Sequence, residues 1–268
     1  MLAPGLVFMN LLQQLWRSSL GKKYIMALSG AGLFLFVVGH LVGNLQFFLP
    51  PEAINRYGHF LKSTPEILWP ARLGLLALVG LHIASAVTLS AQNKAARPQP
   101  YAGKTKSLDA SLASRTMLMS GLTILAFIVY HLLHFTVLLD TINFADVDFN
   151  ELYIPNTGEQ DIYAMMVCGF SVWYVSLFYV IAVGLLCLHL GHGLAAMFQS
   201  LGLNNHTWGP RIASFARVAS IALFLGYVSL PVSVIVFHHG QAYAKPIKDG
   251  VAKGRPGLPV KPVKGGAK

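Results

Sequence analysis

Charged residues are scarce in this sequence. Asp, Glu, Lys and Arg make up only 11% of the chain, whereas hydrophobic residues make up 54% and the mean hydropathy is +0.57. Because a soluble domain carries about 25% charged residues, this composition excludes an ordinary cytosolic fold and a disordered chain. A nucleic-acid-binding module is excluded as well, since the Lys and Arg residues lie outside the long apolar runs. The composition indicates an integral membrane protein.

Cysteine is also rare, and a typical export signal is missing. The two cysteines, Cys168 and Cys187, cannot build a disulfide framework, and we interpret both as small core residues. The sequence contains no CxxCH motif, which excludes covalent attachment of a c-type haem. The apolar stretch 1–16 precedes its first positive charge, Arg17, which is the reverse of a secretory signal. We therefore predict a short interfacial helix within a cytoplasmic N-terminal segment, residues 1–23.

Long apolar runs, by contrast, are abundant. A helix needs about 20 apolar residues to cross the core of a bilayer. Five runs satisfy this length and together define a predicted transmembrane domain, residues 24–238: 24–49, 67–92, 113–139, 162–199 and 212–238. The fourth is longer than a bilayer requires and is expected to tilt or to project beyond it, and Pro231 is expected to kink the fifth. The predicted fold class is an all-α integral membrane protein with five transmembrane helices.

The distribution of charge between the runs predicts the topology. The loop between the third and fourth runs has no Lys or Arg but six acids: Asp140, Asp146, Asp148, Glu151, Glu159 and Asp161. Basic residues gather before the first run and around the loop between the second and third: Arg17, Lys22, Lys23, Lys94, Arg97, Lys104, Lys106 and Arg115. The positive-inside rule then places the N-terminus in the cytoplasm and the acidic loop outside.

The C-terminal tail, residues 239–268, is the one basic segment that disagrees with this topology. Five spans place it outside the membrane, on the periplasmic or external side, although it is rich in Lys. Three basic clusters on the inner side outweigh this tail, so we keep the predicted orientation. Because the tail is also rich in Pro and Gly, we expect it to be extended and mobile.

Histidine is the informative residue type in so apolar a chain. Of ten histidines, six fall inside the predicted spans: His40, His82, His131, His134, His189 and His192. An ionisable residue inside a membrane indicates a functional site. The alternative is that each imidazole only hydrogen-bonds a neighbouring helix, which we would prefer for a single isolated histidine. At least one histidine on each of four helices favours the functional interpretation.

The depths of these histidines suggest two pairs. At a rise of about 1.5 Å per residue, His40 lies about 25 Å from Lys23 and His131 about 24 Å from Arg115, at the cytoplasmic ends of their helices. His82 lies about 18 Å from Lys94, and His189 about 16 Å from Ser200. Two imidazoles from facing helices are what a b-type haem needs, because each gives one neutral nitrogen to the iron.

Two further histidines remain alternatives at this point. His134 and His192 each lie three residues from a candidate and on nearly the same helix face. The depth in the membrane slightly favours His131 over His134 as the partner of His40. It does not distinguish His189 from His192 as the partner of His82. Glycines on the same helices allow a macrocycle, or equally well a neighbouring helix, to approach closely: Gly39, Gly43, Gly74, Gly80, Gly121, Gly184, Gly191 and Gly193.

Several stretches resemble a known family over roughly residues 18–238. They read SSLGKKYIMALSGAGLFLFVVGHLVGNL, PPEAINRYGHFLKSTPEILWP, GLHIASAV, SGLTILAFIVYHLLHFT and LLCLHLGHGLAAMF. They are similar to the dihaem cytochrome b membrane anchors of bacterial succinate:quinone oxidoreductases and quinol:fumarate reductases. The similarity is to the type with a single five-helix anchor chain.

The resemblance implies a function, a location and ligands. It implies a respiratory complex II anchor in the bacterial inner membrane, bound to an iron–sulfur subunit and to a FAD-containing flavoprotein subunit. Electrons would pass through two haems b to or from a membrane quinone, often menaquinone, and four of the five helices would form the haem-binding bundle. Matching the motifs gives the pairs His40 with His131 and His82 with His189, and puts His192 where other members can carry a residue that does not bind iron.

The sequence departs from the family at two places. A membrane glutamate that some fumarate reductases use for proton transfer is replaced by Cys187. The acid of the quinone site has no clear counterpart; Glu52, His59 and Glu66 are candidates by position, although a solvated loop role is the preferred interpretation. The chain carries no flavin or iron–sulfur motif, so we expect no succinate chemistry in it.

Two other functions compete with this one. One is a b-type cytochrome that anchors a different membrane reductase or a hydrogenase, with other soluble partners. The other is a metal transporter whose histidines bind zinc or copper. We disfavour the transporter because such a site needs three or four ligands at one depth, whereas the predicted pairs lie at two.

Overall fold

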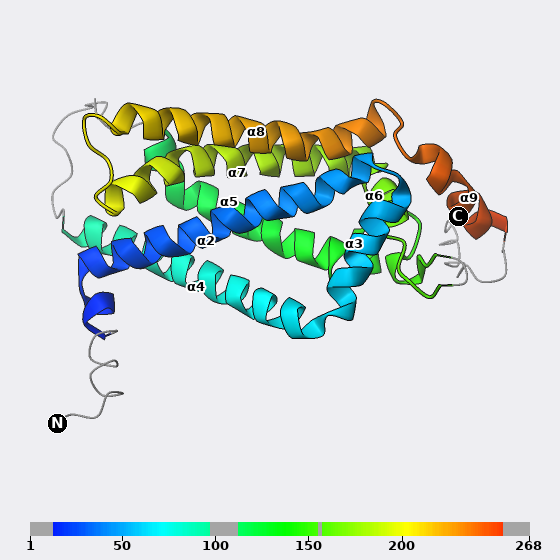
Figure 1. The fold of residues 1–268 in the computed structure, drawn as a ribbon, viewed down its shortest axis with the longest axis horizontal. Coiled ribbons are helices and arrows are strands. Elements are labelled where there is room, and N and C mark those ends of the chain that lie inside the picture. The colour runs from blue at the N-terminus through cyan, green and yellow to red at the C-terminus, as the bar shows by residue number, and fades with distance from the viewer. Residues whose placement is uncertain (1–12, 97–111, 155–156, 254–268) are drawn as a thin grey trace, which may run out of the picture. The chain divides into compact units, whose positions relative to one another are not determined.

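The part of the protein that the structure describes is mainly helical, with irregular stretches at residues 136–154 and 157–161. The computed structural model describes residues 13–96, 112–154 and 157–253. Five long helices dominate it (Figure 1): α2 (Ser19–Leu45), α4 (Pro65–Ala95), α5 (Leu112–Phe135), α7 (Trp173–Ser200) and α8 (Gly209–Ile235). Each contains a stretch long and apolar enough to span a membrane, with a mean hydropathy between 1.9 and 2.1. The prediction of an all-α chain with five candidate spans is confirmed.

The fourth predicted span is the least accurate of the five. Instead of one long tilted helix over residues 162–199, the structure has a short helix, α6 (Ile162–Phe170), followed by α7. The hydroxyl of Ser176 donates a 2.7 Å hydrogen bond to the carbonyl of Phe170 and so satisfies one of the free carbonyls at the end of α6. The extra apolar length therefore belongs to a separate helix, and the single long helix expected over residues 162–199 is wrong.

Helical structure also continues beyond the predicted spans. The first predicted run ends in η1 (Gln46–Phe48), the loop after it forms α3 (Pro51–Ser63), and Pro51 stands at the first position of α3, where its missing N–H is harmless. The tail expected to be extended contains a helix, α9 (Gln241–Lys253). The rest of that tail lies outside the described residues. Pro231 lies within α8, which continues through it to Ile235.

The described part of the N-terminal segment has one notable contact. Residues 13–17 are helical, and most of the predicted interfacial helix, residues 1–16, lies outside the described part. Lys22 is buried, and its amine donates a 2.7 Å hydrogen bond to the carbonyl of Trp16. A positive charge at a helix C-terminus is favourable because the last carbonyls carry partial negative charge. This contact fixes the turn between the two helical segments.

The chain divides into two compact units, and the long helices contribute to both. The first unit consists of Met1–Val38, Trp69–Leu122 and Leu186–Ile221. The second consists of Gly39–Leu68, Thr123–Leu185 and Ala222–Lys268. The predicted division into an N-terminal segment, a transmembrane domain and a tail does not follow these units, because each unit gathers stretches that are far apart in the sequence.

The first unit packs through small residues. A Cβ atom added to Gly32 would lie 2.9 Å from Leu78 Cδ1, and one added to Gly191 would lie 3.1 Å from Ser220 Oγ. Phe215 meets Phe34 edge to face at a centroid distance of 6.3 Å. Close approach at small residues is how helices associate in a membrane. For Gly191, therefore, the helix-packing interpretation holds.

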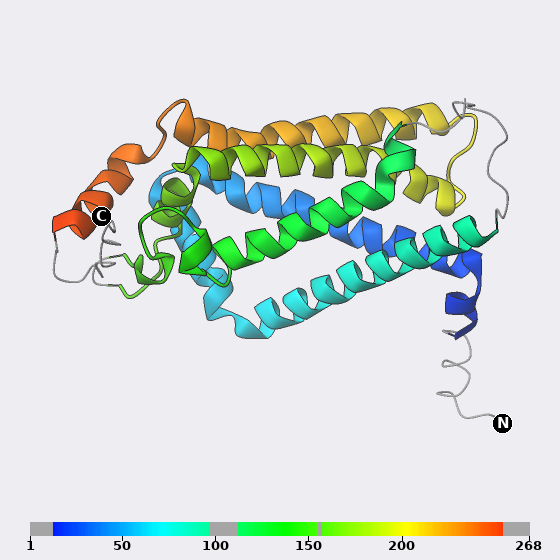
Figure 2. The same cartoon turned by 180° about the vertical axis from the view of Figure 1, so that it is seen from behind.

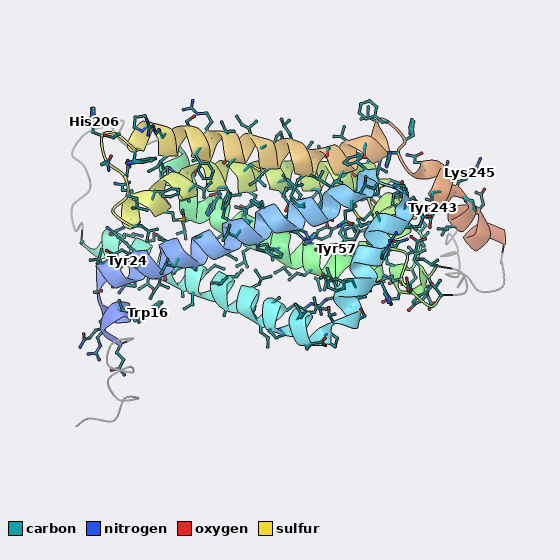
Figure 3. All side chains as sticks on the ribbon, in the orientation of Figure 1. Trp16, Tyr24, Tyr57, His206, Tyr243 and Lys245 are labelled. Carbon is teal, nitrogen blue, oxygen red and sulfur yellow. The ribbon has the colours of Figure 1, made fainter. Side chains whose placement is uncertain are left out.

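The second unit contains a continuous hydrophobic core. Its centre is α6, in which every residue except Ile162 is buried. Helices α3 and α9 both contact α6, and Figures 1 and 2 show these three helices gathered together. Figure 3 labels Tyr57 on α3 and Tyr243 on α9 within this unit. A Cβ added to Gly43 would lie 2.9 Å from the ring of Tyr57, so Gly43 also serves helix packing.

The α6 N-terminus of the second unit is held by a buried carboxylate. Asp161 is 4% exposed, and its Oδ1 accepts hydrogen bonds from the Ala164 N–H and from the Asn55 amide. The side-chain oxygen of Asn55, Oδ1, in turn accepts a 2.9 Å hydrogen bond from the backbone N–H of Tyr163. An Asp at this position is a favourable N-cap because it satisfies free N–H groups and the helix dipole. The network joins α3 to α6.

Candidate functional site

The structure brings the four singled-out histidines together in two pairs, each within one unit. In the second unit, the rings of His40 on α2 and His131 on α5 have centroids 5.8 Å apart at an interplanar angle of 83°. In the first unit, the rings of His82 on α4 and His189 on α7 have centroids 6.4 Å apart at 64°. These are the two pairs that the depth argument joins. Each comes from two different long helices.

The spacing of each pair fits one metal ion between two imidazoles. A metal–imidazole bond is about 2 Å long, and a ring nitrogen lies about 1.1 Å from the centroid of its own ring. Two rings that bind one ion from opposite sides therefore have centroids roughly 6 Å apart. Both observed separations, 5.8 and 6.4 Å, agree with this value. The pairs are thus spaced as two imidazoles that hold one metal ion would be.

Hydrogen bonds orient both rings of the pair in the first unit. His82 Nδ1 lies 3.1 Å from the carbonyl of Met26 and 3.4 Å from Ser29 Oγ. A carbonyl can only accept, so Nδ1 carries the proton of a neutral His82 ring, and Nε2 is left with its lone pair. Metal-binding histidines are usually fixed in this way, by a hydrogen bond from the ring nitrogen that does not bind the metal.

His189 is oriented by the same kind of contact. Its Nδ1 lies 3.1 Å from Ser120 Oγ, whose own proton is directed to the carbonyl of Met117 at 3.0 Å. The serine oxygen therefore accepts the Nδ1–H of His189. In a neutral ring this again leaves Nε2 as the nitrogen that can bind a metal. Neither Ser29 nor Ser120 was singled out from the sequence.

A glycine next to each of these serines makes room for the histidine. A Cβ atom on Gly30 would lie 3.2 Å from His82 Cε1, and one on Gly121 would lie 3.5 Å from His189 Cε1. A Ser–Gly dipeptide thus stands beside each of the two rings. The serine hydroxyl lies within hydrogen-bond distance of the ring nitrogen, and the glycine, which has no side chain, leaves space for the edge of the ring. The presence of this dipeptide in the first and third apolar runs is a sequence signal that could have identified these residues.

The pair in the second unit has different surroundings. His131 Nδ1 lies 3.4 Å from the hydroxyl of Tyr179. The side-chain nitrogen of Asn44 lies 3.4 Å from both ring nitrogens of His40 and donates a 2.7 Å hydrogen bond to the His40 carbonyl. The ring of Tyr227 has its centroid 6.2 Å from that of His40. Asn44, Tyr179 and Tyr227 were all missed, since a polar or aromatic residue on a membrane helix has many possible roles.

The two alternative histidines take other positions. The His134 side chain is fully buried and stacks on Phe149 at a centroid distance of 5.6 Å. Its Nδ1 lies 2.9 Å from the Tyr179 hydroxyl. Its Nε2 has no hydrogen-bond partner among the described residues. His192 is half-buried, and in the described part of the chain the ring facing His82 is that of His189.

The remaining glycines and Cys187 contribute less to the geometry of the site. Cys187 and Cys168 are both buried, as expected for small core residues. A Cβ on Gly184 would make an ordinary 3.6 Å contact with Phe224. Added Cβ atoms would meet nothing within 4 Å at four positions: Gly39, Gly74, Gly80 and Gly193.

The three loop residues considered for a quinone are on the surface. Glu52 and Glu66 are exposed, and His59 Nδ1 lies 3.4 Å from Glu159 Oε1. None of them lines the groove of about 560 Å³ that runs along α3. That groove is lined by Gln46, Ala53, Arg56, Tyr57 and Phe60.

Titratable groups away from the long helices also cluster in the second unit. The Tyr243 hydroxyl donates a 2.7 Å hydrogen bond to Asp161 Oδ2. Burial, followed by this hydrogen bond and the charge of Asp161, raises the pKa of the Tyr243 phenol. Burial and the same carboxylate raise the pKa of Tyr163. Both phenols therefore stay protonated well into alkaline conditions.

Comparison with known proteins adds no family to this description. No family model, no curated protein and no solved structure matches the chain. Nor do the described residues contain a group of three or more His, Cys, Asp or Glu side chains arranged to hold a metal ion. The molecule is defined by its class, a helical protein with five candidate membrane spans, and by its two imidazole pairs.

Proposed function

We propose that this chain is a membrane electron-transfer subunit that binds two b-type haems, one at each imidazole pair. The observation that carries the proposal is the geometry of the pairs, with centroids 5.8 and 6.4 Å apart on four different helices. A bound haem supplies a one-electron carrier that cycles between ferric and ferrous iron. No part of the chain needs to react covalently.

The residues of the chain have three tasks in this proposal. The four histidines give neutral nitrogens to the irons. Ser120 and the carbonyl of Met26 hold the Nδ1–H groups of His189 and His82 and so fix the direction of the nitrogens that bind. Gly30 and Gly121 leave space beside the ring edges. The apolar helices around each pair exclude water and keep the metal in a medium of low dielectric constant, which helps to set its potential.

The particular enzyme we propose is a respiratory complex II, in which this chain is the membrane anchor. The resemblance of residues 18–238 to dihaem anchors supports this. The partners would be an iron–sulfur subunit and a FAD-containing flavoprotein subunit, and the electron acceptor or donor would be a membrane quinone such as menaquinone. In a bacterial inner membrane the charge distribution favours a cytoplasmic N-terminus and an external C-terminus.

The groove along α3 is our candidate for the quinone site. Its lining is mostly apolar and includes the polar side chains of Gln46, Arg56 and Tyr57, a combination that small-molecule sites use. Tyr57 packs on Gly43, which lies three residues, or about 4.5 Å along the helix axis, after His40. A quinone head group held there would be close to the proposed haem of the second unit.

The proposal is tested by measuring haem in the purified protein. We expect two haems b per chain by pyridine haemochrome assay, with a Soret band and a reduced-minus-oxidised spectrum typical of paired imidazoles. A colourless protein that binds zinc stoichiometrically would overturn the proposal and favour the metal transporter. Retention of two haems without a co-purifying FAD protein, and without succinate-dependent quinone reduction, would favour an anchor for a different reductase or hydrogenase.

A further inference from the structure

Tyr179 lies between two histidines in the core of the second unit. Its side chain is 5% exposed, and its hydroxyl is 2.9 Å from His134 Nδ1 and 3.4 Å from His131 Nδ1. Aromatic rings surround it: Phe127, Tyr130, Phe135, Phe170 and Phe178. Among the described residues, these two imidazoles are the hydrogen-bond partners of the hydroxyl.

The number of available protons fixes the direction of both hydrogen bonds. If His131 binds iron through Nε2, its Nδ1 carries the proton and must donate. The oxygen of Tyr179 then accepts from His131, and its one proton is donated to Nδ1 of His134. His134 consequently holds its own proton on Nε2. The result is a directed chain of hydrogen bonds from His131 through Tyr179 to His134.

The burial of His134 indicates that its imidazole has a role beyond packing. His134 is fully buried, and its Nε2 has no partner among the described residues. A buried polar group without a partner is unfavourable, so packing alone would be served better by an apolar side chain. The imidazole does, however, give Tyr179 an acceptor that no hydrocarbon could offer. His134 thus has a role even though its ring does not face His40.

We propose that Tyr179 is a positioning residue that orients His131 and lowers the reduction potential of the haem bound between His40 and His131, and that His134 holds the Tyr179 hydroxyl in place. The inference rests on the proposed function. A hydrogen bond accepted from Nδ1–H makes the imidazole a stronger electron donor, which favours ferric over ferrous iron. Donation from Tyr179 to His134 reinforces the effect because chained hydrogen bonds polarise one another.

The test is a redox titration of Tyr179→Phe in the purified protein. We expect both haems to be retained and one of the two midpoint potentials to rise. The expected size is about a tenfold change in the equilibrium between ferric and ferrous iron, or about 59 mV for one electron. The other midpoint potential should not move. An unchanged pair of midpoint potentials in a variant that keeps both haems would overturn the inference.

Tyr130→Phe is the matched control. It removes the same hydroxyl from the same aromatic cluster, because the ring of Tyr130 packs on those of Tyr179 and His134. Its hydroxyl, however, bonds the carbonyl of Ile142 at 3.2 Å and not an imidazole. We expect no shift in either potential. An equal rise in Tyr130→Phe would show that repacking, and not the hydrogen bond to His131, causes the change.

A second variant keeps the inference testable if Tyr179→Phe loses haem. His134→Phe preserves a flat ring and removes both imidazole nitrogens, including the Nδ1 that accepts the Tyr179 proton. We expect a smaller rise in the same potential. Where Tyr179→Phe keeps its haem, Tyr179→Phe/His134→Phe should show no rise beyond that of Tyr179→Phe alone. No shift in His134→Phe, or additive shifts in the double variant, would overturn the role of His134. A wild-type protein without haem would instead overturn the proposed function itself.

Discussion

The phenol of Tyr243 on α9 donates a 2.7 Å hydrogen bond to Oδ2 of Asp161, the residue that caps α6. Positions 161 and 243 belong to a loop and to a tail that the sequence marked only by their charge. The contact joins the chain after the last long helix to the buried core of the second unit. It explains why this part of the tail is helical, since docking on α6 gives α9 contacts that a solvated segment would not have.

Replacing Tyr243 should make the protein less stable and change how its stability depends on pH. Tyr243→Phe removes one hydrogen bond to a buried carboxylate, so we expect a loss of about 1–2 kcal/mol. The folded-state pKa of Tyr243 is raised above its unfolded value of about 10. The stabilisation is therefore complete below about pH 10 and is lost as the pH rises further towards the folded pKa. Thermal unfolding in detergent from pH 8 to 11 measures both effects.

Tyr153→Phe is the control. Tyr153 and Tyr243 are 51% and 39% exposed, but the Tyr243 hydroxyl bonds the buried carboxylate of Asp161. Tyr153→Phe should therefore leave the melting temperature and its alkaline decline unchanged. Tyr243→Phe should lose stability less steeply than the wild type above pH 10. Equal alkaline slopes in all three proteins would mean that Tyr243 does not contribute to this decline.

Removal of single imidazoles should separate ligands from their neighbours. If each pair holds one haem, we expect each of His40→Ala, His82→Ala, His131→Ala and His189→Ala to lose one or both haems, because only one imidazole of the pair would remain to hold the iron. His134→Ala and His192→Ala should keep two haems per chain. Pyridine haemochrome assays on the purified variants measure this directly. The opposite pattern, with loss in His134→Ala and retention in His131→Ala, would reassign the ligand on α5.

The long helices and the pairing of histidines were accessible from sequence because both follow from simple periodicities. A bilayer sets the length of an apolar run, and a constant rise per residue converts position into depth. These two rules put His40 and His131 at one level, and the structure places their rings 5.8 Å apart. The division of the fourth run was not accessible, since residues 162–199 are continuously apolar and the break depends on a contact of Ser176 with a backbone carbonyl.

The repeated Ser–Gly dipeptide marks Ser29 and Ser120, but which histidine each orienting group contacts was inaccessible for a different reason. Ser29 and Tyr179 meet their histidines across helices, at sequence separations of 53 and 48 residues. Such contacts depend on the rotation of one helix against another, which a hydropathy pattern leaves undetermined. Their residue types give little help, because a serine or tyrosine on an apolar helix more often bonds its own backbone or packs against a neighbour.

Filling the space beside a histidine should displace it. Gly30→Val adds a branched side chain whose Cβ alone would lie 3.2 Å from His82 Cε1, so we expect the His82–His189 site to lose its haem. Gly74→Val is the control, because a Cβ at this helical glycine would meet nothing within 4 Å. It should keep two haems per chain. Equal haem contents in the two variants would show that the His82 ring tolerates a side chain at position 30.

The groove along α3 can be tested through its one cationic side chain. Arg56 is exposed and lines this groove, and a guanidinium can donate a charge-assisted hydrogen bond to a quinone carbonyl. If the quinone binds there, Arg56→Ala should lower kcat/KM for a short-chain quinone about tenfold, the loss expected for one such hydrogen bond. Haem content and both midpoint potentials should stay as in the wild type.

Arg72→Ala is the matched control, since Arg72 lies over the ring of Trp69 at 5.3 Å and does not line the groove. It should leave quinone kinetics unchanged in the assembled complex. A normal kcat/KM in Arg56→Ala, or an equal loss in both variants, would place quinone binding away from this groove while leaving the two-haem proposal intact, because neither arginine touches an imidazole pair.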